Sequence, residues 1–165
     1  MSAAIRKLLA KDSDRMFSCL LDKENLKYLT LGYRDFVLSD CARFIDDKKR
    51  DCIDFAIVDE KDEWHGTVSL KHIDETNKKA EYAIITGSSI HGTGLATKAT
   101  KELIDNAFNV LGLSKLFLNV VSENRRAISF YKKCGFKLVG LSHRSVVLGK
   151  AFYDLEWYEL LNENF

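Results

Sequence analysis

The feature of this sequence that most constrains its fold is a strand–helix–strand pattern in the second half of the chain. Ala80 to Ile85 reads as a strand, and Lys115 to Val121 is a second, strongly β-prone run. Between them, Leu95 to Leu111 carries apolar residues at helical spacing, and Gly112 is well placed to end that helix. Because strands joined by a crossover helix lie parallel in one sheet, the pattern predicts an α/β layered domain with a parallel strand pair.

The rest of the chain alternates short strands and helices in the order β-α-α-β-β-β-α-β-α-β-β. The expected strands are 5–9, 53–58, 64–73, 80–85, 115–121, 136–141 and 153–161, and the expected helices are 12–21, 39–50, 95–111 and 124–134. Polar turns at 60–63 and 74–78 join the second to fourth strands into an antiparallel meander. We therefore expect one domain over residues 1–165, with a mixed central sheet of about seven strands flanked by about four helices.

The composition is that of a globular domain and argues against several classes of protein. Of 165 residues, 46% are hydrophobic and 30% charged, and the net charge of +1 offers no broad basic surface for a nucleic acid. No apolar run approaches the roughly 20 residues that span a membrane, and the first ten residues are too charged for a secretory signal. The four cysteines form no C-x-x-C pair, and the four histidines show no metal-binding spacing. We expect a cytoplasmic protein with buried free thiols and without a metal, a membrane or a nucleic-acid partner.

The turn before the long helix can hold an anion. Gly92 and Gly94 let the backbone approach a ligand closely, and the first N–H groups of the helix point at it without an intrahelical partner. A Walker phosphate loop is missing from the sequence, and Thr97 occupies the place of the third glycine of a dinucleotide fingerprint. Taken alone, the turn fits a pyrophosphate site and a purely structural helix start equally well.

A second pattern follows about thirty residues later, directly after the last strand of the crossover. It consists of Asn124, Ala127, Tyr131, Gly135 and Phe136. Ala127 and Tyr131 are one helical turn apart, so that the small side chain leaves room for a ligand which the phenol can reach. The alternative is that Tyr131 is a half-buried aromatic residue of the core.

Together these segments resemble the GNAT superfamily of N-acetyltransferases. His91–Ala96 resembles its pyrophosphate motif Q/R-x-x-G-x-G/A, with His91 in place of the usual Gln or Arg. Asn124–Phe136 resembles the second signature of the superfamily. Ala107–Leu116 is similar to a stretch of its ribosomal-protein-alanine and spermidine acetyltransferase branch. The resemblance implies the GNAT fold, acetyl-CoA as acyl donor and direct transfer of the acetyl group to a primary amine.

The resemblance also implies two catalytic roles. Tyr131 would protonate the departing thiolate, because a phenol is protonated at neutral pH and can donate. An alkyl ammonium must lose a proton before it attacks, and Glu81, at the start of the strand that flanks the cofactor, is the best placed carboxylate. A solvated charge at a strand end is an equally good interpretation of Glu81.

For the cofactor, the resemblance implies that the backbone of residues 84–86 pairs with the pantetheine amides. It also implies that Asn124 contacts the pantetheine or the carbonyl region of the cofactor. Lys98, Arg125, Lys132 and Lys133 are candidate phosphate contacts. The full set of expected cofactor-binding residues is Ile84, Ile85, Thr86, His91, Gly92, Thr93, Gly94, Leu95, Ala96, Thr97, Asn124, Ala127, Tyr131 and Lys133.

The sequence leaves the acceptor open. A protein α-amine, a polyamine and an amino group on a nucleotide-linked sugar all remain, as does a non-catalytic acyl-CoA-binding module. Tyr28, Tyr33 and Phe36 lie in the segment that borders the acceptor site in the superfamily. The final strand, rich in leucine and aromatic residues, could pair with another subunit in a homo-oligomer.

Overall fold

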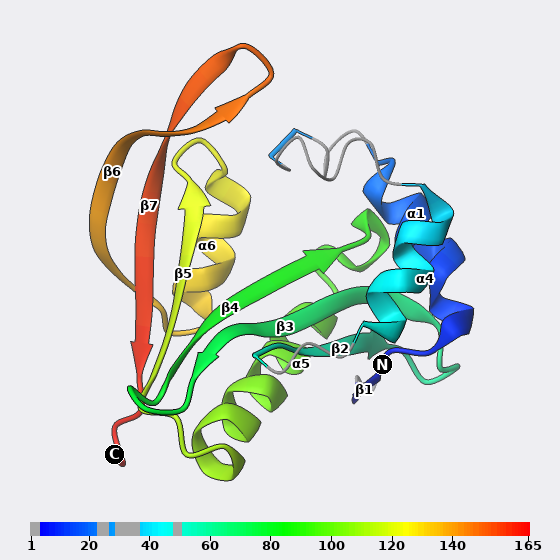
Figure 1. Cartoon of the computed structure of the whole chain (residues 1–165), viewed down its shortest axis with the longest axis horizontal. Helices are drawn as coiled ribbons and strands as arrows, with labels where there is room; N and C mark the ends of the chain where they lie inside the picture. Colours follow the sequence, from blue (N-terminus) through cyan, green and yellow to red (C-terminus); the bar gives the residue numbers. More distant parts are fainter. Residues whose placement is uncertain (1–3, 23–26, 29–36, 48–50) are drawn as a thin grey trace.

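The computed structural model describes residues 4–22, 27–28, 37–47 and 51–165, which form a seven-stranded mixed sheet in the order β1-β2-β3-β4-β5-β7-β6 (Figure 1). The strands are β1 (Ala4–Lys7), β2 (Ile53–Val58), β3 (Trp64–Asp74), β4 (Lys79–Thr86), β5 (Lys115–Val121), β6 (Lys137–Leu148) and β7 (Ala151–Leu161). The α-helices are α1 (Ser13–Leu20), α4 (Leu38–Asp46), α5 (Leu95–Asp105) and α6 (Arg125–Lys133), and a π-helical turn (Asn106–Val110) extends α5. The predicted fold class is confirmed.

Helices cover both faces of the sheet, because neighbouring residues of a strand point to opposite sides. On one face, Ile57 packs in a buried core with Leu103 of α5 and Ile128 of α6. On the other face, Ala56 and Trp64 pack with the buried residues of α1 and α4. Figure 1 shows α1 and α4 on the side of the sheet opposite to α5.

The parallel pair predicted from the crossover is present but short. β4 and β5 pair only over Lys79–Glu81 and Lys115–Phe117. Beyond these residues β4 continues to Thr86 beside β3, while β5 continues to Val121 beside β7. The two strands diverge in Figure 1, and the sheet is therefore split along its middle.

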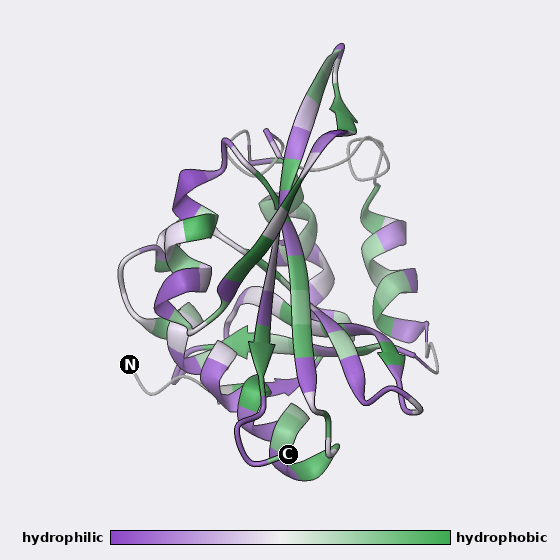
Figure 2. Cartoon of the chain, turned by 90° about the vertical axis from the view of Figure 1, so that its left-hand side faces the viewer, coloured by the Kyte–Doolittle hydropathy of each residue, from purple (hydrophilic) through white to green (hydrophobic). Residues whose placement is uncertain are grey.

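β6 and β7 form a longer hairpin than the sequence pattern predicts. The expected strand over 136–141 in fact reaches Leu148, and its partner begins at Ala151. The polar run 142–145 hides this continuation, because the register shifts there and Arg144 has a φ of 50°. Figure 2 shows the hairpin with stretches of hydrophilic and of hydrophobic residues along its length.

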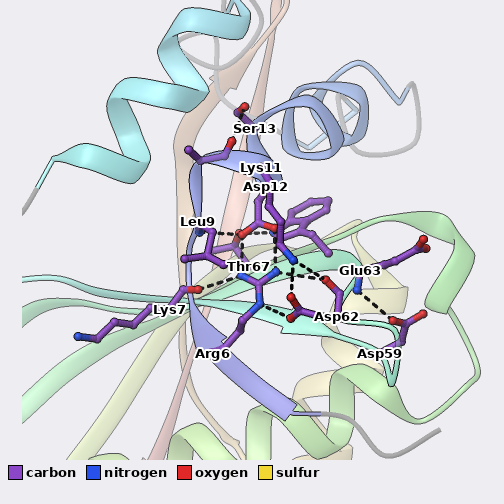
Figure 3. Close-up of polar contacts among 12 residues, drawn as sticks. Arg6, Lys7, Leu9, Lys11, Asp12, Ser13, Asp59, Asp62, Glu63 and Thr67 are labelled. Carbon is purple, nitrogen blue, oxygen red and sulfur yellow. Dashed lines mark hydrogen bonds and ion pairs between the residues drawn. The ribbon is translucent and has the colours of Figure 1, made fainter.

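A buried ion pair fixes the first strand to the start of α1 (Figure 3). Arg6 donates to both carboxylate oxygens of Asp12, at 2.8 and 2.9 Å, and Asp12 is only 2% exposed. The Leu9 N–H donates to the same carboxylate at 2.8 Å. Burial raises the pKa of Asp12, but the hydrogen bonds from Arg6 and Leu9 outweigh burial and hold the pKa below its ordinary value. Asp62, on the β2–β3 hairpin, accepts from Arg6 and from Lys11 at the protein surface.

None of the four cysteines, all of which lie among the described residues, forms a disulfide. Cys19 and Cys41 are buried as expected, whereas Cys52 and Cys134 are partly exposed. Among the described residues, no helix combines the length and apolar character that crossing a membrane requires.

Candidate active site

A pocket of about 540 Å³ lies where β4 and β5 diverge. Its walls come from the end of β4, the turn before α5, the end of β5 and the first turns of α6. The lining includes Ile84, Ile85, Thr86, His91, Gly92, Gly94, Ala96, Thr97, Asn124, Ala127, Tyr131 and Lys133. The structure thus brings residues of both sequence motifs to one pocket.

The two glycines of the turn before α5 have a backbone conformation that other residues rarely adopt. Gly92 and Gly94 have φ values of 80° and 84°, in the left-handed region, and Gly94 is the N-cap of α5. A side chain at either position would meet no protein atom within 4 Å, so within the protein itself glycine is required by φ. In the first turn of α5, Ala96 and Thr97 line the pocket, and N–H groups at this place have no intrahelical acceptor. The positive end of α5 therefore faces the pocket, as an anion site requires.

Two of the expected cofactor residues hold the turn instead of lining the pocket. The Thr93 hydroxyl donates to the Ile90 carbonyl at 2.8 Å and accepts from the Leu95 N–H at 3.2 Å. Leu95 is 2% exposed and packs in the core. Their contribution is to the shape of the turn.

Tyr131 lies at the inner end of the pocket and is 9% exposed. Its ring packs edge-on against Tyr82 and Phe136, with centroids 6.1 and 6.2 Å apart. Burial raises the pKa of Tyr131 to about 12. The phenol is therefore held in one place and stays protonated at neutral pH.

Asn124 caps α6. Its side-chain oxygen accepts the Ala127 N–H at 3.2 Å. This contact fixes the amide so that its NH₂ group remains a donor for a ligand, since an amide carries both an acceptor and two donor hydrogens. Asn124 and Ala127 both line the pocket.

His91 stands at the mouth of the pocket, between β4 and α6. Its Nε2 lies 3.4 Å from the Thr86 hydroxyl and its Nδ1 lies 3.2 Å from Nη1 of Arg126. Partial burial, followed by the guanidinium of Arg126, lowers the pKa of His91, and Asp22 opposes this shift.

Several lining residues were not predicted from the sequence. Those from the end of β5 and from α6 are Asn119, Val120, Val121, Arg126, Ser129 and Phe130. The β5 residues reach the pocket because β5 diverges from β4, and the sequence carries no sign of where this pairing stops.

Of the cations expected near the phosphates, Lys133 lines the pocket, whereas Arg125 lies 3.8 Å from Glu156.

Tyr28 also lines this pocket, and its phenol donates to the Glu123 carbonyl at 3.2 Å. From the sequence, Tyr28 was expected in the segment that borders the acceptor site. Tyr33 and Phe36 lie outside the described residues.

A second pocket of about 220 Å³ lies on the other face of the sheet, under α1 and α4. Ile84 and Ile85 line both pockets, so that the end of β4 forms a shared wall. The remaining lining is mostly apolar and comprises Met16, Leu20, Cys41, Phe44, Trp64, Thr67, Ser69, Lys71 and Ala83. Among the described residues, Lys71 is the one charged residue that lines this pocket.

Glu81 lines neither pocket. It pairs across the sheet with Lys71, at the closed end of the split, and its carboxylate lies 3.6 Å from Nε2 of His72. Strand alternation puts its side chain on the same face as Ala83 and Ile85, which is the face of the second pocket. The structure therefore does not bring Glu81 into contact with Tyr131, but it does place Glu81 beside the second pocket.

Comparison with known proteins agrees with this geometry. Residues 4–137 match the family model of the acetyltransferase (GNAT) domain. A spermidine N(1)-acetyltransferase of Escherichia coli is 42% identical over 86 residues, which cover 52% of this chain and 46% of that relative. The match therefore spans about half the length of that relative. An N-acetyltransferase p20 of Bacillus licheniformis is 28% identical over 98% of this chain and 93% of its own length.

Among solved structures, the fold is similar to that of a spermidine N-acetyltransferase from Vibrio cholerae in complex with CoA and spermine. The TM-score is 0.85 at 21% identity, over 96% of this chain and 95% of the other.

Proposed function

The chain belongs to the GNAT acetyltransferase family, and on this basis we propose that it transfers an acetyl group from acetyl-CoA directly to a primary amine. The observation that carries the proposal is the pocket in the split between β4 and β5, where the glycine turn and the buried Tyr131 meet. The second pocket, which shares a wall with the first, is the proposed acceptor site.

The donor would lie along the split sheet. After Glu81, β4 is no longer paired with β5. The edge of residues 84–86 that faces away from β3 can therefore hydrogen-bond the pantetheine amides, which would take the place of a neighbouring strand. The diphosphate would then meet the turn of Gly92 and Gly94 at the positive end of α5. The relative solved with CoA supports this placement through its similar fold.

The transfer needs two proton movements. The neutral amine nitrogen attacks the thioester carbonyl carbon, the C–S bond breaks, and the thiolate takes a proton from the phenol of Tyr131. The attacking nitrogen gives its own proton to a base. Because Glu81 lies beside the second pocket and outside the first, we propose that it accepts this proton through water.

Replacing Glu81 by glutamine should lower kcat about a hundredfold near neutral pH, because the amide cannot accept the proton. The loss should shrink as the pH rises, because hydroxide and other bases in solution can then take the proton from the attacking nitrogen. Initial rates measured from about pH 6 to about pH 9 test this, with Glu75→Gln, on an exposed turn, as the control. An unchanged kcat for Glu81→Gln would remove Glu81 from the mechanism.

We propose a polyamine as the acceptor. The relatives that act on spermidine support this choice. The apolar side chains of Met16, Leu20 and Trp64 suit an aliphatic chain, and the aromatic faces of Trp64 and Phe44 can attract an ammonium group. Lys71 also lines this pocket, and its charge would repel a second ammonium group of the polyamine.

Replacing Lys71 by methionine therefore discriminates between acceptors. For a polyamine, the change should lower KM about threefold, because it removes a repulsive charge near a group of like sign. Lys137→Met, on the exposed part of β6, serves as the control. If KM for spermidine rises or stays constant while KM for a carboxylate-bearing peptide rises, a protein α-amine is the better acceptor.

The proposal as a whole is tested by product analysis. Purified protein is incubated with acetyl-CoA and spermidine, with an N-terminal peptide, or with an amino sugar, and each product is examined by mass spectrometry. We expect a mono-acetylated polyamine. Binding of acetyl-CoA without any acetylated amine would instead indicate a non-catalytic acyl-CoA-binding module.

A further inference from the structure

We infer that Arg126 binds the diphosphate of CoA and that His91 is the residue which positions Arg126 for this contact. The inference rests on the proposed function, because it adds a residue to the proposed donor site. It concerns the position at the head of the glycine turn where the sequence departs from the motif it resembles.

The contact joins three separate elements around the pocket. Thr86 ends β4, His91 begins the turn before α5, and Arg126 lies in the first turn of α6. His91 contacts Arg126 at 3.2 Å through Nδ1 and Thr86 at 3.4 Å through Nε2. All three residues line the pocket. The histidine therefore bridges the mouth of the pocket from one wall to the other.

The chemistry of the two side chains assigns their roles. A guanidinium can only donate, so Nδ1 of His91 must be the acceptor, and the ring proton lies on Nε2, facing the Thr86 hydroxyl. The lowered pKa of His91 is consistent with this neutral form. Among the described residues, the charged groups that act on the ring are Arg126 on α6 and Asp22 beyond the end of α1. One N–H of Arg126 is used by His91, which leaves the others for an anion.

The position of Arg126 points to the diphosphate rather than to another part of the donor. Arg126 is held by the residue that directly precedes Gly92, and the turn that follows presents the N–H groups of Ala96 and Thr97. A planar guanidinium with several free donors matches a phosphate group well. In the related motif, Gln or Arg occupies the position of His91. In this chain the positive charge belongs to Arg126 of α6, and His91 holds Arg126 in place.

Binding of three ligands tests the role of Arg126. CoA, 3′-dephospho-CoA and pantetheine are titrated by calorimetry into wild type, Arg126→Met and Arg43→Met. For Arg126→Met we expect Kd to rise about tenfold for CoA and for 3′-dephospho-CoA and to stay constant for pantetheine, as for the loss of one charge-assisted hydrogen bond. Arg43, on α4, is 76% exposed in its side chain and lies outside the pocket lining, so Arg43→Met should change none of the three. An effect that disappears with 3′-dephospho-CoA would assign Arg126 to the 3′-phosphate and overturn the inference.

Variants of His91 test the positioning role. His91→Gln keeps an acceptor toward Arg126 and should bind CoA within about twofold of wild type, whereas His91→Leu should lose as much affinity as Arg126→Met. In the Arg126→Met background, His91→Leu should add nothing further. Additive losses, or a loss in His91→Gln equal to that in His91→Leu, would contradict the inference.

These outcomes separate the two proposals. If wild type binds no CoA, the proposed function fails and this inference fails with it. If wild type binds CoA and Arg126→Met binds it equally well, the proposed function stands and only this inference is wrong.

Discussion

Replacement of Tyr131 by phenylalanine should lower kcat about a thousandfold, within the range found when a general acid is removed. The phenol is the group that we propose to protonate the departing thiolate. Burial raises its pKa to about 12, so that it carries its proton at neutral pH. Phenylalanine fills the same space between Tyr82 and Phe136 but cannot donate. The loss should therefore appear in kcat.

The binding of acetyl-CoA should not change in this variant. The Kd of Tyr131→Phe for acetyl-CoA, measured by calorimetry, should stay within about twofold of wild type, since the donor is held by β4, the glycine turn and α6. Tyr153→Phe, a tyrosine of β7 outside the pocket lining, is the matched control and should keep full activity. An active Tyr131→Phe variant would show that the thiolate leaves without this proton.

Replacement of Asp12 by alanine should lower the free energy of unfolding by about 3 kcal/mol, the cost of removing one partner of a buried ion pair. Asp12 is almost fully buried and accepts three hydrogen bonds, two of them from Arg6. Without it, the guanidinium of Arg6 keeps Asp62 but loses its buried partner. Urea denaturation followed by circular dichroism measures the change. Asp62→Asn is the control, because asparagine tolerates the left-handed backbone of this residue, where φ is 60°. Since Asp62 lies at the surface, this change should have a much smaller effect.

The same ion pair should contribute to the loss of stability in acid. The pKa of Asp12 is below its ordinary value in the folded protein, so the carboxylate stabilises the fold above the unfolded pKa of about 3.9. That stabilisation is lost as the pH falls through the lower, folded value. Asp12→Ala should therefore show a shallower fall in stability below about pH 4 than wild type. Equal slopes for the two proteins would mean that the Arg6–Asp12 pair contributes little.

Most of the fold could be predicted from local patterns in the sequence. The crossover from Ala80 to Val121 has a helical period between two β-prone runs, and this pattern predicts the parallel pair that the structure contains. The meander of β2, β3 and β4 follows from polar turns between apolar runs, and the structure confirms it. The end of β6 was missed because the polar residues 142–145 interrupt the alternation that marks a strand.

The site could be predicted less completely, because it depends on where two strands stop pairing. The glycine turn and the Asn124–Tyr131 helix carry recognisable spacing, and the structure brings them to one pocket. The end of β5 joins that pocket only because β5 diverges from β4 after Phe117, an event of the tertiary fold that leaves no local pattern. Arg126 was missed for a similar reason, since its contact to His91 links residues 35 positions apart in the chain.

We propose that the split between β4 and β5 binds acetyl-CoA and passes its acetyl group to an amine. The most direct measurement is the rate of CoA thiol release by the wild-type protein, with acetyl-CoA present and the amine varied among spermidine, peptides and amino sugars. We predict release that depends on the amine, saturates with spermidine and falls about a thousandfold in Tyr131→Phe. Tight binding of acetyl-CoA with no amine-dependent release for any of these acceptors would contradict the account.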